Sequence, residues 1–302
     1  DQAFEAFSDV SEGENADYIP ILATVPSEMF GIAIVTRDGK IYTAGEQDYR
    51  FSIQSVSKPF TAALIMARQG PIAIREKIGV EPTGLPFNSK LAIEILDARS
   101  VNPLVNAGAI SSVSMVKASS EEERWQMVLG NLSDFAGESL PLMEEVYESE
   151  YTTSWGNRGI ANNLYNYERL YSDAEEALRV YTKQCSVGVT TRDLAIMGAT
   201  LANGGVNPKT GKRLINEAYV PELLAIMLTA GFYDGSGYWS MTAGLPSKTG
   251  VGGGIVSVVP GKMAIAAFSP RLDEYGNSVR AQNAIRHIAG QLGVGIFGPN
   301  PD

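Results

Sequence analysis

The chain of 302 residues contains a single cysteine, Cys185, and a single histidine, His287. One cysteine excludes an internal disulfide framework and any zinc site built from several cysteines. One histidine excludes the two-histidine motif of the HExxH zinc proteases, and a Ser-His-Asp triad would have to rely on His287 alone. Hydrolytic chemistry on this chain therefore has to proceed with little help from imidazole.

Basic charge and long apolar runs are also scarce. The 34 acidic and 24 basic residues give a net charge of −10, and because nucleic-acid binding needs a basic face, no nucleic-acid partner is expected. The sequence contains no run of about 18 apolar residues, so no membrane span is predicted. Residues 1–18 lack the pattern of a signal peptide. The possibility that a leader was removed before Asp1 stays open. We expect a cytoplasmic protein, since one free cysteine suits a reducing compartment.

Two hairpin patterns lie near opposite ends of the chain. Asp38-Gly39 and Pro260-Gly261 supply the turn residues that tight hairpins need. The β-rich runs that they separate are residues 31–36, 40–43, 254–259 and 263–268.

The pattern between the hairpins is mostly helical, from about residue 56 to 190. Helix starts are expected at Ser120, Ser172 and Thr190, and a last helix is expected to begin at Ser278 and to stop at Gly293.

This order predicts an α/β fold of the α+β type, in which an antiparallel sheet from both chain termini is covered by helices. We expect residues 1–58 and 190–302 to form this sheet domain, and residues 59–189 to form an inserted helical domain. The cleft between the two is the expected ligand site.

Ser55-Val56-Ser57-Lys58 is the first candidate for chemistry, and a helical run from Phe60 to Ala67 follows it. Residues three apart share a helix face, so Ser55 Oγ and Lys58 Nζ are expected within hydrogen-bond reach. A neutral lysine, with its pKa lowered by burial or a nearby positive charge, can take the serine proton. By itself the motif more often marks a capping serine beside a solvated lysine.

Lys248-Thr249-Gly250 is the second candidate, at the start of a predicted strand far downstream. The two motifs together form the pattern of the serine penicillin-recognising enzymes, and the pair is far more specific than either alone. The glycines let the backbone approach a substrate closely. An N–H group there and that of Ser55 could together hold an oxyanion.

The two rare residues fit structural roles better than catalytic ones. Cys185 has no histidine near it in sequence, which favours a buried thiol over a nucleophile. His287 is expected on a solvated helix face because no partner can be assigned to it. The residues on that face are Arg280, Asn283 and Gln291.

Taken together, the motifs resemble those of the serine-dependent glutaminase family, which shares the β-lactamase and penicillin-binding protein architecture. The resemblance covers residues 17–295, and Asn106–Ile110 and Gln184–Ser186 favour glutaminases over β-lactamases. Gln54 and Thr249 stand where the family more often has glutamate and serine. The matching segments are Tyr18–Pro20, Asp48–Phe51, Pro82–Asn88, Asn102–Ile110, Tyr181–Ser186 and Lys248–Gly254.

The resemblance implies a role for each matching position. Ser55 would be the nucleophile and Lys58 its base, the N–H groups of Ser55 and Val251 would form the oxyanion hole, and Tyr181 and Tyr233 would relay protons. The implied substrate-binding residues are Ser55, Asn106, Glu150, Asn157, Tyr181, Tyr233, Val251 and Tyr18.

Two of these roles have a clear chemical sense for free glutamine. Glu150 can pair with the α-ammonium and Asn157 can hydrogen-bond the α-carboxylate. Tyr18 would cover the mouth of the pocket.

The implied activity is hydrolysis of the side-chain amide of L-glutamine (EC 3.5.1.2) through a glutamyl ester, with no metal or organic cofactor. A homo-oligomer, dimer or tetramer, is implied as well. Two alternatives stay open: a β-lactamase or DD-peptidase-like serine hydrolase, and a glutamine-binding module without activity on the same fold.

Overall fold

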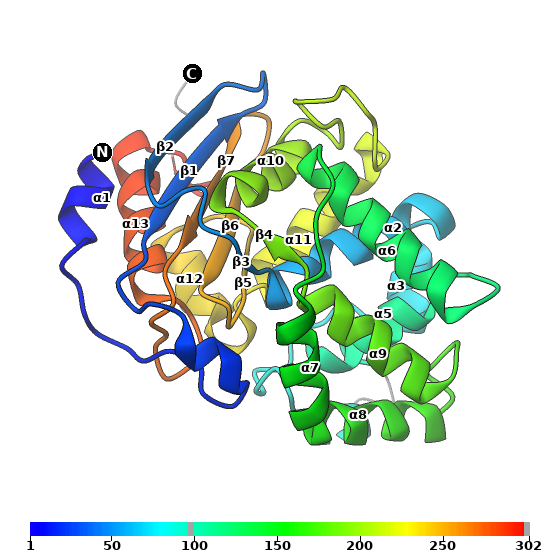
Figure 1. Cartoon of the computed structure of the whole chain (residues 1–302). Coiled ribbons are helices and arrows are strands. Elements are labelled where there is room, and N and C mark those ends of the chain that lie inside the picture. The colour runs from blue at the N-terminus through cyan, green and yellow to red at the C-terminus, as the bar shows by residue number, and fades with distance from the viewer. Residues whose placement is uncertain (96–99, 299–302) are drawn as a thin grey trace.

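Five antiparallel strands form the main sheet, and they come from both ends of the chain (Figure 1). The computed structural model describes residues 1–95 and 100–298. The strand order is β2-β1-β7-β6-β5, and β1 pairs with β7 from Gly31↔Phe268 to Thr36↔Met263. Both predicted hairpins and the sheet built from the two termini are thereby confirmed. The strands are β1 (Gly31–Thr36), β2 (Ile41–Gly45), β5 (Ser247–Thr249), β6 (Gly254–Val259) and β7 (Met263–Phe268).

Helices cover both faces of this sheet, because its strands alternate apolar side chains between two buried sides. Ala33 and Val256 face α10 (Thr191–Ala202) in one core cluster. Ile32 and Ile255 face the opposite way, toward α13 (Val279–Leu292). Figure 1 shows α13 and α1 (Gln2–Phe7) on the opposite side of the sheet from α10.

The middle of the chain is helical, as expected, and gathers beside the sheet in Figure 1. It contains α2 (Lys58–Gln69), α3 (Pro71–Lys77), α4 (Leu91–Ile95), α5 (Asn106–Ser114), α6 (Glu121–Ala136), α7 (Glu144–Thr153), α8 (Trp155–Asn166) and α9 (Ala174–Cys185). Two more helices, α11 (Val220–Ala230) and α12 (Ser236–Thr242), precede β5. The 3₁₀ turns are η1 (Pro20–Thr24), η2 (Gln54–Ser57), η3 (Glu217–Tyr219) and η4 (Tyr233–Gly235).

The helix starts follow the predicted caps with one correction. Ser120, Thr190 and Ser278 each accept a hydrogen bond from a backbone N–H of the first turn. The prediction of Ser172 as a cap is wrong, because Asp173 stands at that position and its carboxylate accepts from two backbone N–H groups.

A second, two-stranded sheet was not predicted from the sequence. In it β3 (Phe51–Ser52) pairs with β4 (Gly188–Val189). Because β3 leads directly into η2, this short pairing fixes the start of the turn that carries Ser55.

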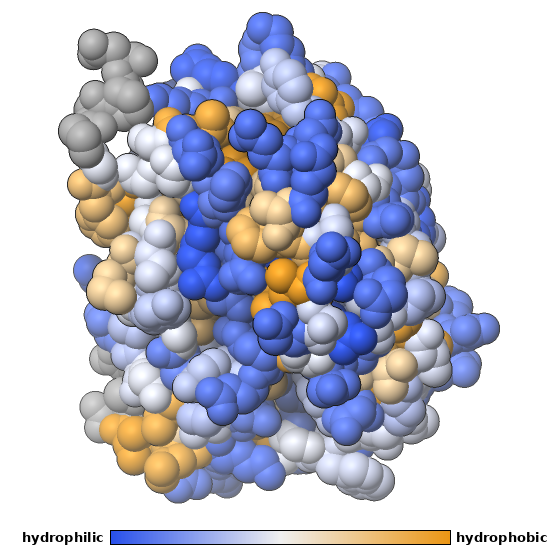
Figure 2. All heavy atoms as spheres, turned by 90° about the vertical axis from the view of Figure 1, so that its left-hand side faces the viewer, coloured by the Kyte–Doolittle hydropathy of each residue, from blue (hydrophilic) through white to orange (hydrophobic). Residues whose placement is uncertain are grey.

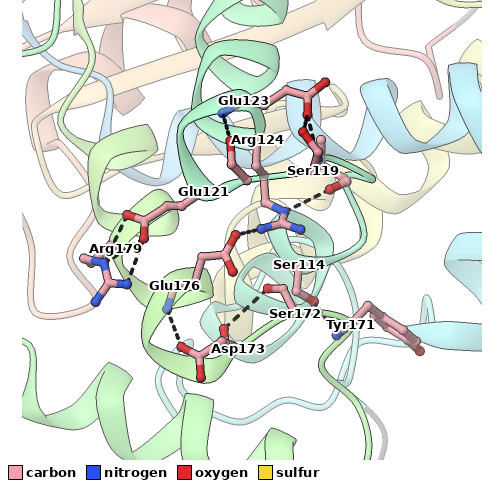
Figure 3. Close-up of polar contacts among 12 residues, drawn as sticks. Ser114, Ser119, Glu121, Glu123, Arg124, Tyr171, Ser172, Asp173, Glu176 and Arg179 are labelled. Carbon is pink, nitrogen blue, oxygen red and sulfur yellow. Dashed lines mark hydrogen bonds and ion pairs between the residues drawn. The ribbon is translucent and has the colours of Figure 1, made fainter.

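α9 is held against α6 by charged side chains (Figure 3). Arg179 donates to both carboxylate oxygens of Glu121 at 2.8–3.1 Å, and Arg124 pairs with Glu176. These contacts orient the helix on which Tyr181 lies.

The surface on the side of α1 is largely hydrophilic, with apolar patches among the polar side chains (Figure 2). His287 is half-buried there and packs edge-on against the Phe7 ring at 5.7 Å, so the expectation of a solvated histidine is wrong because α1 covers it. Within residues 1–95 and 100–298, no helix is both long and apolar enough to cross a membrane.

Candidate active site

Ser55 lies in η2, between β3 and the first residue of α2, and its side chain lines a cavity. The residue before it, Gln54, has a φ of 47° although it is not a glycine. Such a conformation costs about 1–3 kcal/mol and persists only where the surroundings hold it. Strained backbone next to a serine in a cavity is typical of an active site.

Lys58 is 1% exposed, and its Nζ donates a hydrogen bond to Asn106 Oδ1 at 2.7 Å. Burial lowers the pKa of Lys58 to about 7, against smaller opposing effects of Cys185 and Glu150. The expected hydrogen bond to Ser55 is not formed; the amine is instead directed at the amide oxygen of Asn106. Hydrogen bonds of a catalytic base are often loose before substrate binds, and a pKa near 7 suits that role.

Two buried tyrosines flank the amine of Lys58. Tyr181 donates to Asn106 Oδ1 at 3.2 Å, and the ring centroids of Tyr181 and Tyr233 lie 5.9 and 5.4 Å from Lys58 Nζ. Burial raises the pKa of both hydroxyls, and for Tyr233 the nearby Ser55 side chain opposes this rise. The Tyr233 hydroxyl forms no hydrogen bond of ordinary geometry within the described chain, and the side chain with the largest effect on its pKa is that of Ser55.

The Lys248-Thr249-Gly250 motif lies directly beside the serine. A Cβ built on Gly250 would come within 3.2 Å of the Ser55 nitrogen. Among the described residues, the N–H groups of Ser55 and Val251 donate to no backbone carbonyl. Two adjacent free N–H groups at a serine match the requirement of an oxyanion hole.

Glu150, on α7, is a carboxylate at the wall of the cavity and is 6% exposed. Burial raises its pKa to about 7, while the hydrogen bond from Gln54 Nε2 at 3.1 Å and the charge of Lys58 act in the opposite direction. Its second oxygen is left for a cation.

Asn106, Asn157 and Tyr18 complete the predicted set. Asn106 Nδ2 donates to Asn157 Oδ1 at 2.8 Å, which leaves the Asn157 amide N–H groups for a ligand. Tyr18 is 54% exposed at the edge of the cavity, and burial of its hydroxyl end and the charge of Glu150 raise its pKa.

The cavity holds about 130 Å³, which suits a small metabolite. All predicted site residues except Lys58 and Tyr233 line it, and these two contact Asn106 and Ser55 from behind the wall. The lining residues are Tyr18, Ile19, Gln54, Ser55, Phe87, Asn88, Asn106, Glu150, Thr153, Ser154, Gly156, Asn157, Tyr181 and Val251.

Several functional neighbours were missed from the sequence. Phe87 packs against the Tyr233 ring at 5.0 Å, and Thr153 and Ser154 follow Glu150 along the cavity wall. Lys248 is fully buried, with its Nζ 4.0 Å from the Tyr233 centroid and hydrogen-bonded to Gly231 O and Thr249 O. Burial lowers its pKa. The motif containing Lys248 was recognised, but its amine had been given no role.

Cys185 is buried, as expected, and burial raises the pKa of its thiol. A high pKa disfavours the thiolate that a cysteine nucleophile needs. Among residues 1–95 and 100–298, no three histidine, cysteine or acidic side chains cluster as metal ligands would.

Comparison with known proteins agrees with this geometry. The family model named Glutaminase matches residues 13–297. The chain belongs to the glutaminase family. It is 53% identical to a glutaminase of Colwellia psychrerythraea and 52% identical to glutaminase 1 of Escherichia coli K12, each over 98% of this chain and 96% of the relative.

Solved glutaminase structures also superpose closely. One described as a probable glutaminase, ybaS, gives a TM-score of 0.97 at 52% identity over 98% of this chain and 96% of that one. A probable glutaminase from Bacillus subtilis complexed with 6-diazo-5-oxo-L-norleucine gives 0.89 at 31% identity over 98% and 94%. Glutaminases convert glutamine to glutamate and ammonia, and the prediction of this activity from the sequence is confirmed.

Proposed function

We propose that this glutaminase works through a Ser-Lys dyad. The neutral amine of Lys58 takes the proton of Ser55, whose Oγ attacks the side-chain amide carbon of L-glutamine. The N–H groups of Ser55 and Val251 bind the oxyanion. As the C–N bond breaks, the leaving amide nitrogen takes the proton from Lys58 or a tyrosine and departs as ammonia. Water then hydrolyses the glutamyl ester to glutamate.

The observation that carries this proposal is the buried lysine with a pKa of about 7 beside a serine whose N–H, like that of Val251, donates to no backbone carbonyl of the described residues. An amine that is largely neutral at physiological pH can act as a base, whereas an ordinary lysine cannot. The interaction of the Tyr233 hydroxyl with Ser55 supports a role for this tyrosine in passing the proton onward.

We propose that Glu150 binds the α-ammonium of glutamine and Asn157 its α-carboxylate, with Tyr18 closing over the mouth. A site that pairs both ends rejects amides that lack them, because buried polar groups would be left without partners. L-Asparagine is one methylene shorter, so its amide carbon would stop short of Ser55. D-Glutamine would exchange the positions of the two charged groups.

We further propose that the protein is cytoplasmic and needs no cofactor. We also propose that it assembles as a homo-oligomer, a dimer or tetramer. Light scattering after size exclusion measures this mass directly, and a monomeric mass at micromolar concentration would defeat the assembly proposal.

The experiment that tests the mechanism is Ser55→Ala, assayed for ammonia release from L-glutamine, L-asparagine and D-glutamine. We expect no measurable release from the variant, and release by the wild type mainly from L-glutamine. Ser112→Ala is the matched control, because Ser112 is a buried serine whose hydroxyl, in the part of the chain that the structure describes, bonds only to Gly108 O of its own helix. Turnover by Ser55→Ala with an intact fold would contradict the proposal.

A further inference from the structure

A chain of three buried polar side chains joins α2 and α9 to the peptide unit that precedes Ser55. Thr61 Oγ1 donates to Gln184 Oε1 at 2.6 Å, and Gln184 Nε2 donates to Ser57 Oγ at 3.0 Å. Ser57 Oγ in turn donates to the carbonyl oxygen of Gln54 at 2.7 Å. Thr61, Gln184 and Ser57 are each no more than 1% exposed, so water cannot replace these bonds.

The direction of every proton in this chain is fixed by chemistry. The carbonyl of Gln54 can only accept, so the Ser57 hydroxyl has to donate to it. Ser57 then accepts from Gln184, whose amide nitrogen therefore faces Ser57. The amide oxygen of Gln184 faces Thr61, which donates to it and holds this orientation.

The carbonyl at the end of the chain belongs to the same peptide unit as the N–H of Ser55. Described peptide bonds are trans, so the carbonyl and N–H of one planar unit point in opposite directions. Holding the Gln54 carbonyl on Ser57 consequently aims the Ser55 N–H toward the cavity. A hydrogen bond to the carbonyl also polarises the amide and strengthens its N–H as a donor.

We propose that Gln184 is a positioning residue for the oxyanion hole: through Ser57 it holds the strained Gln54–Ser55 peptide in the orientation that presents the Ser55 N–H. This inference rests on the proposed role of Ser55. A glutamine that only filled space between helices would cost folding free energy, because a buried amide has to be fully hydrogen-bonded to offset its loss of water. A role in setting the geometry of the oxyanion hole would explain why a glutamine, rather than an apolar residue, lies at this buried position.

The test is the kinetics of Gln184→Met, which keeps a long side chain but removes the hydrogen bonds. Loss of one oxyanion donor typically lowers kcat by about 10²–10³-fold, so loosening that donor is expected to lower kcat by about 10–100-fold. KM should change by less than about 3-fold, since the hole acts mainly in the transition state. The pH profile of kcat should keep its shape because Lys58 is untouched.

Two further variants test the chain itself. Ser57→Ala should lower kcat similarly, and the double variant with Gln184→Met should be no slower than the worse single variant, since both break one chain. Thr61→Val should lower kcat in the same direction, and Thr61→Ser should restore it. Thr200→Val is the matched control, because Thr200 is a buried threonine whose hydroxyl, among the described residues, bonds only to Ile196 O of its own helix.

The outcomes separate this inference from the mechanism on which it rests. Ammonia release by Ser55→Ala defeats the proposed nucleophile. With Ser55→Ala silent, wild-type kcat in Gln184→Met overturns the positioning role alone. The positioning role is also overturned if the kcat losses of Ser57→Ala and Gln184→Met multiply in the double variant. The same holds if Thr200→Val loses as much kcat as Thr61→Val.

Discussion

Burial changes the acid–base chemistry of Lys58, the base of the proposed mechanism. Its amine is 1% exposed and meets no carboxylate in the hydrogen-bond pattern of the described chain, only Asn106 Oδ1. Removing the charged form from water lowers the pKa from 10.5 to about 7. The same burial that makes the amine reactive should make the folded state less stable, because the unfolded chain binds the proton more tightly.

The free-energy cost of burying this amine predicts that Lys58→Met is inactive but more stable than the wild type. Below pH 7 the amine is charged in both states, so its full burial cost is present. Between about pH 7 and 10.5 only the unfolded state binds the proton, so the free energy of unfolding of the wild type rises with pH. At about 1.4 kcal/mol per pKa unit, the variant should gain roughly 3–5 kcal/mol below pH 7.

Urea unfolding of both proteins at pH 6 and pH 10, followed by circular dichroism, measures this gain. The advantage of Lys58→Met should shrink toward the higher pH. An advantage that grows with pH, or a variant less stable than the wild type at pH 6, would refute the burial argument.

Glu150 carries the second prediction at the residue scale. Glu150→Gln keeps the shape and a hydrogen bond with Gln54 but removes the charge that would meet the ammonium of glutamine. Breaking a charged hydrogen bond in a buried site costs about 2–3 kcal/mol, so KM should rise about 100-fold and kcat should fall less. Glu148→Gln, an exposed position on the same helix, is the control and should leave steady-state kinetics unchanged. An unchanged KM in Glu150→Gln would remove the residue from substrate binding.

At the scale of elements, local patterns predicted the strands well and the contacts between them less well. The runs 254–259 and 263–268 were predicted with the bounds that the structure has. Alternation and turn residues are local, so one sequence is enough to see them. The pairing of β3 with β4 joins Phe51 to Val189, and no local pattern marks such a distant, two-residue contact.

The site follows the same division. Motif spacing found Ser55 and Lys58, and the family resemblance added Glu150; the structure brings all three to one cavity and its wall. It did not find the positive φ of Gln54, because backbone strain of a non-glycine residue is imposed by the folded surroundings. Gln184 was seen only as part of a family segment, since its proposed role depends on contacts with Ser57 of η2 and Thr61 of α2, which are distant in sequence.

The turn that follows β5 gives a prediction for this element. A Cβ on Gly252 would lie 2.4 Å from Ser52 O and 3.3 Å from Gln54 Cγ, too close for any side chain. Gly252→Ala should push this segment away from Ser55 and lower kcat by about 100-fold or more, as losing an oxyanion donor does. Steady-state ammonia release measures the effect.

Gly130→Ala is its control, because nothing lies within 4 Å of a Cβ at this position in α6. Replacing a helical glycine by alanine should raise stability by up to about 1 kcal/mol and leave kcat unchanged. Normal kcat in Gly252→Ala would show that the close approach to Ser52 does not position the site.

At the scale of the whole molecule, the two proposed domains share one apolar core. We propose the division into residues 1–58 with 190–302 and residues 59–189 as a description of chain topology. The same buried cluster includes Val256 and Ala264 of the sheet and Phe60, Phe135 and Val180 of the helical region. A large apolar contact of this kind opposes independent motion or unfolding of the two parts.

The shared core predicts that the protein unfolds in a single step, and two buried tryptophans can report it. Trp125 lies in α6 of the helical region and Trp239 in α12 beside the sheet, 5% and 2% exposed. Two variants are needed, each keeping only one of these tryptophans and each carrying Trp155→Phe. Within each variant, the urea midpoint measured by fluorescence should equal the midpoint measured by circular dichroism. Coincident probes are the mark of two-state unfolding. A Trp125 signal lost at a different urea concentration from the circular dichroism signal of the same variant would contradict this prediction. Residues 59–189 would then have to form a core of their own, and the cleft at Ser55 would lie between two domains that can move relative to one another.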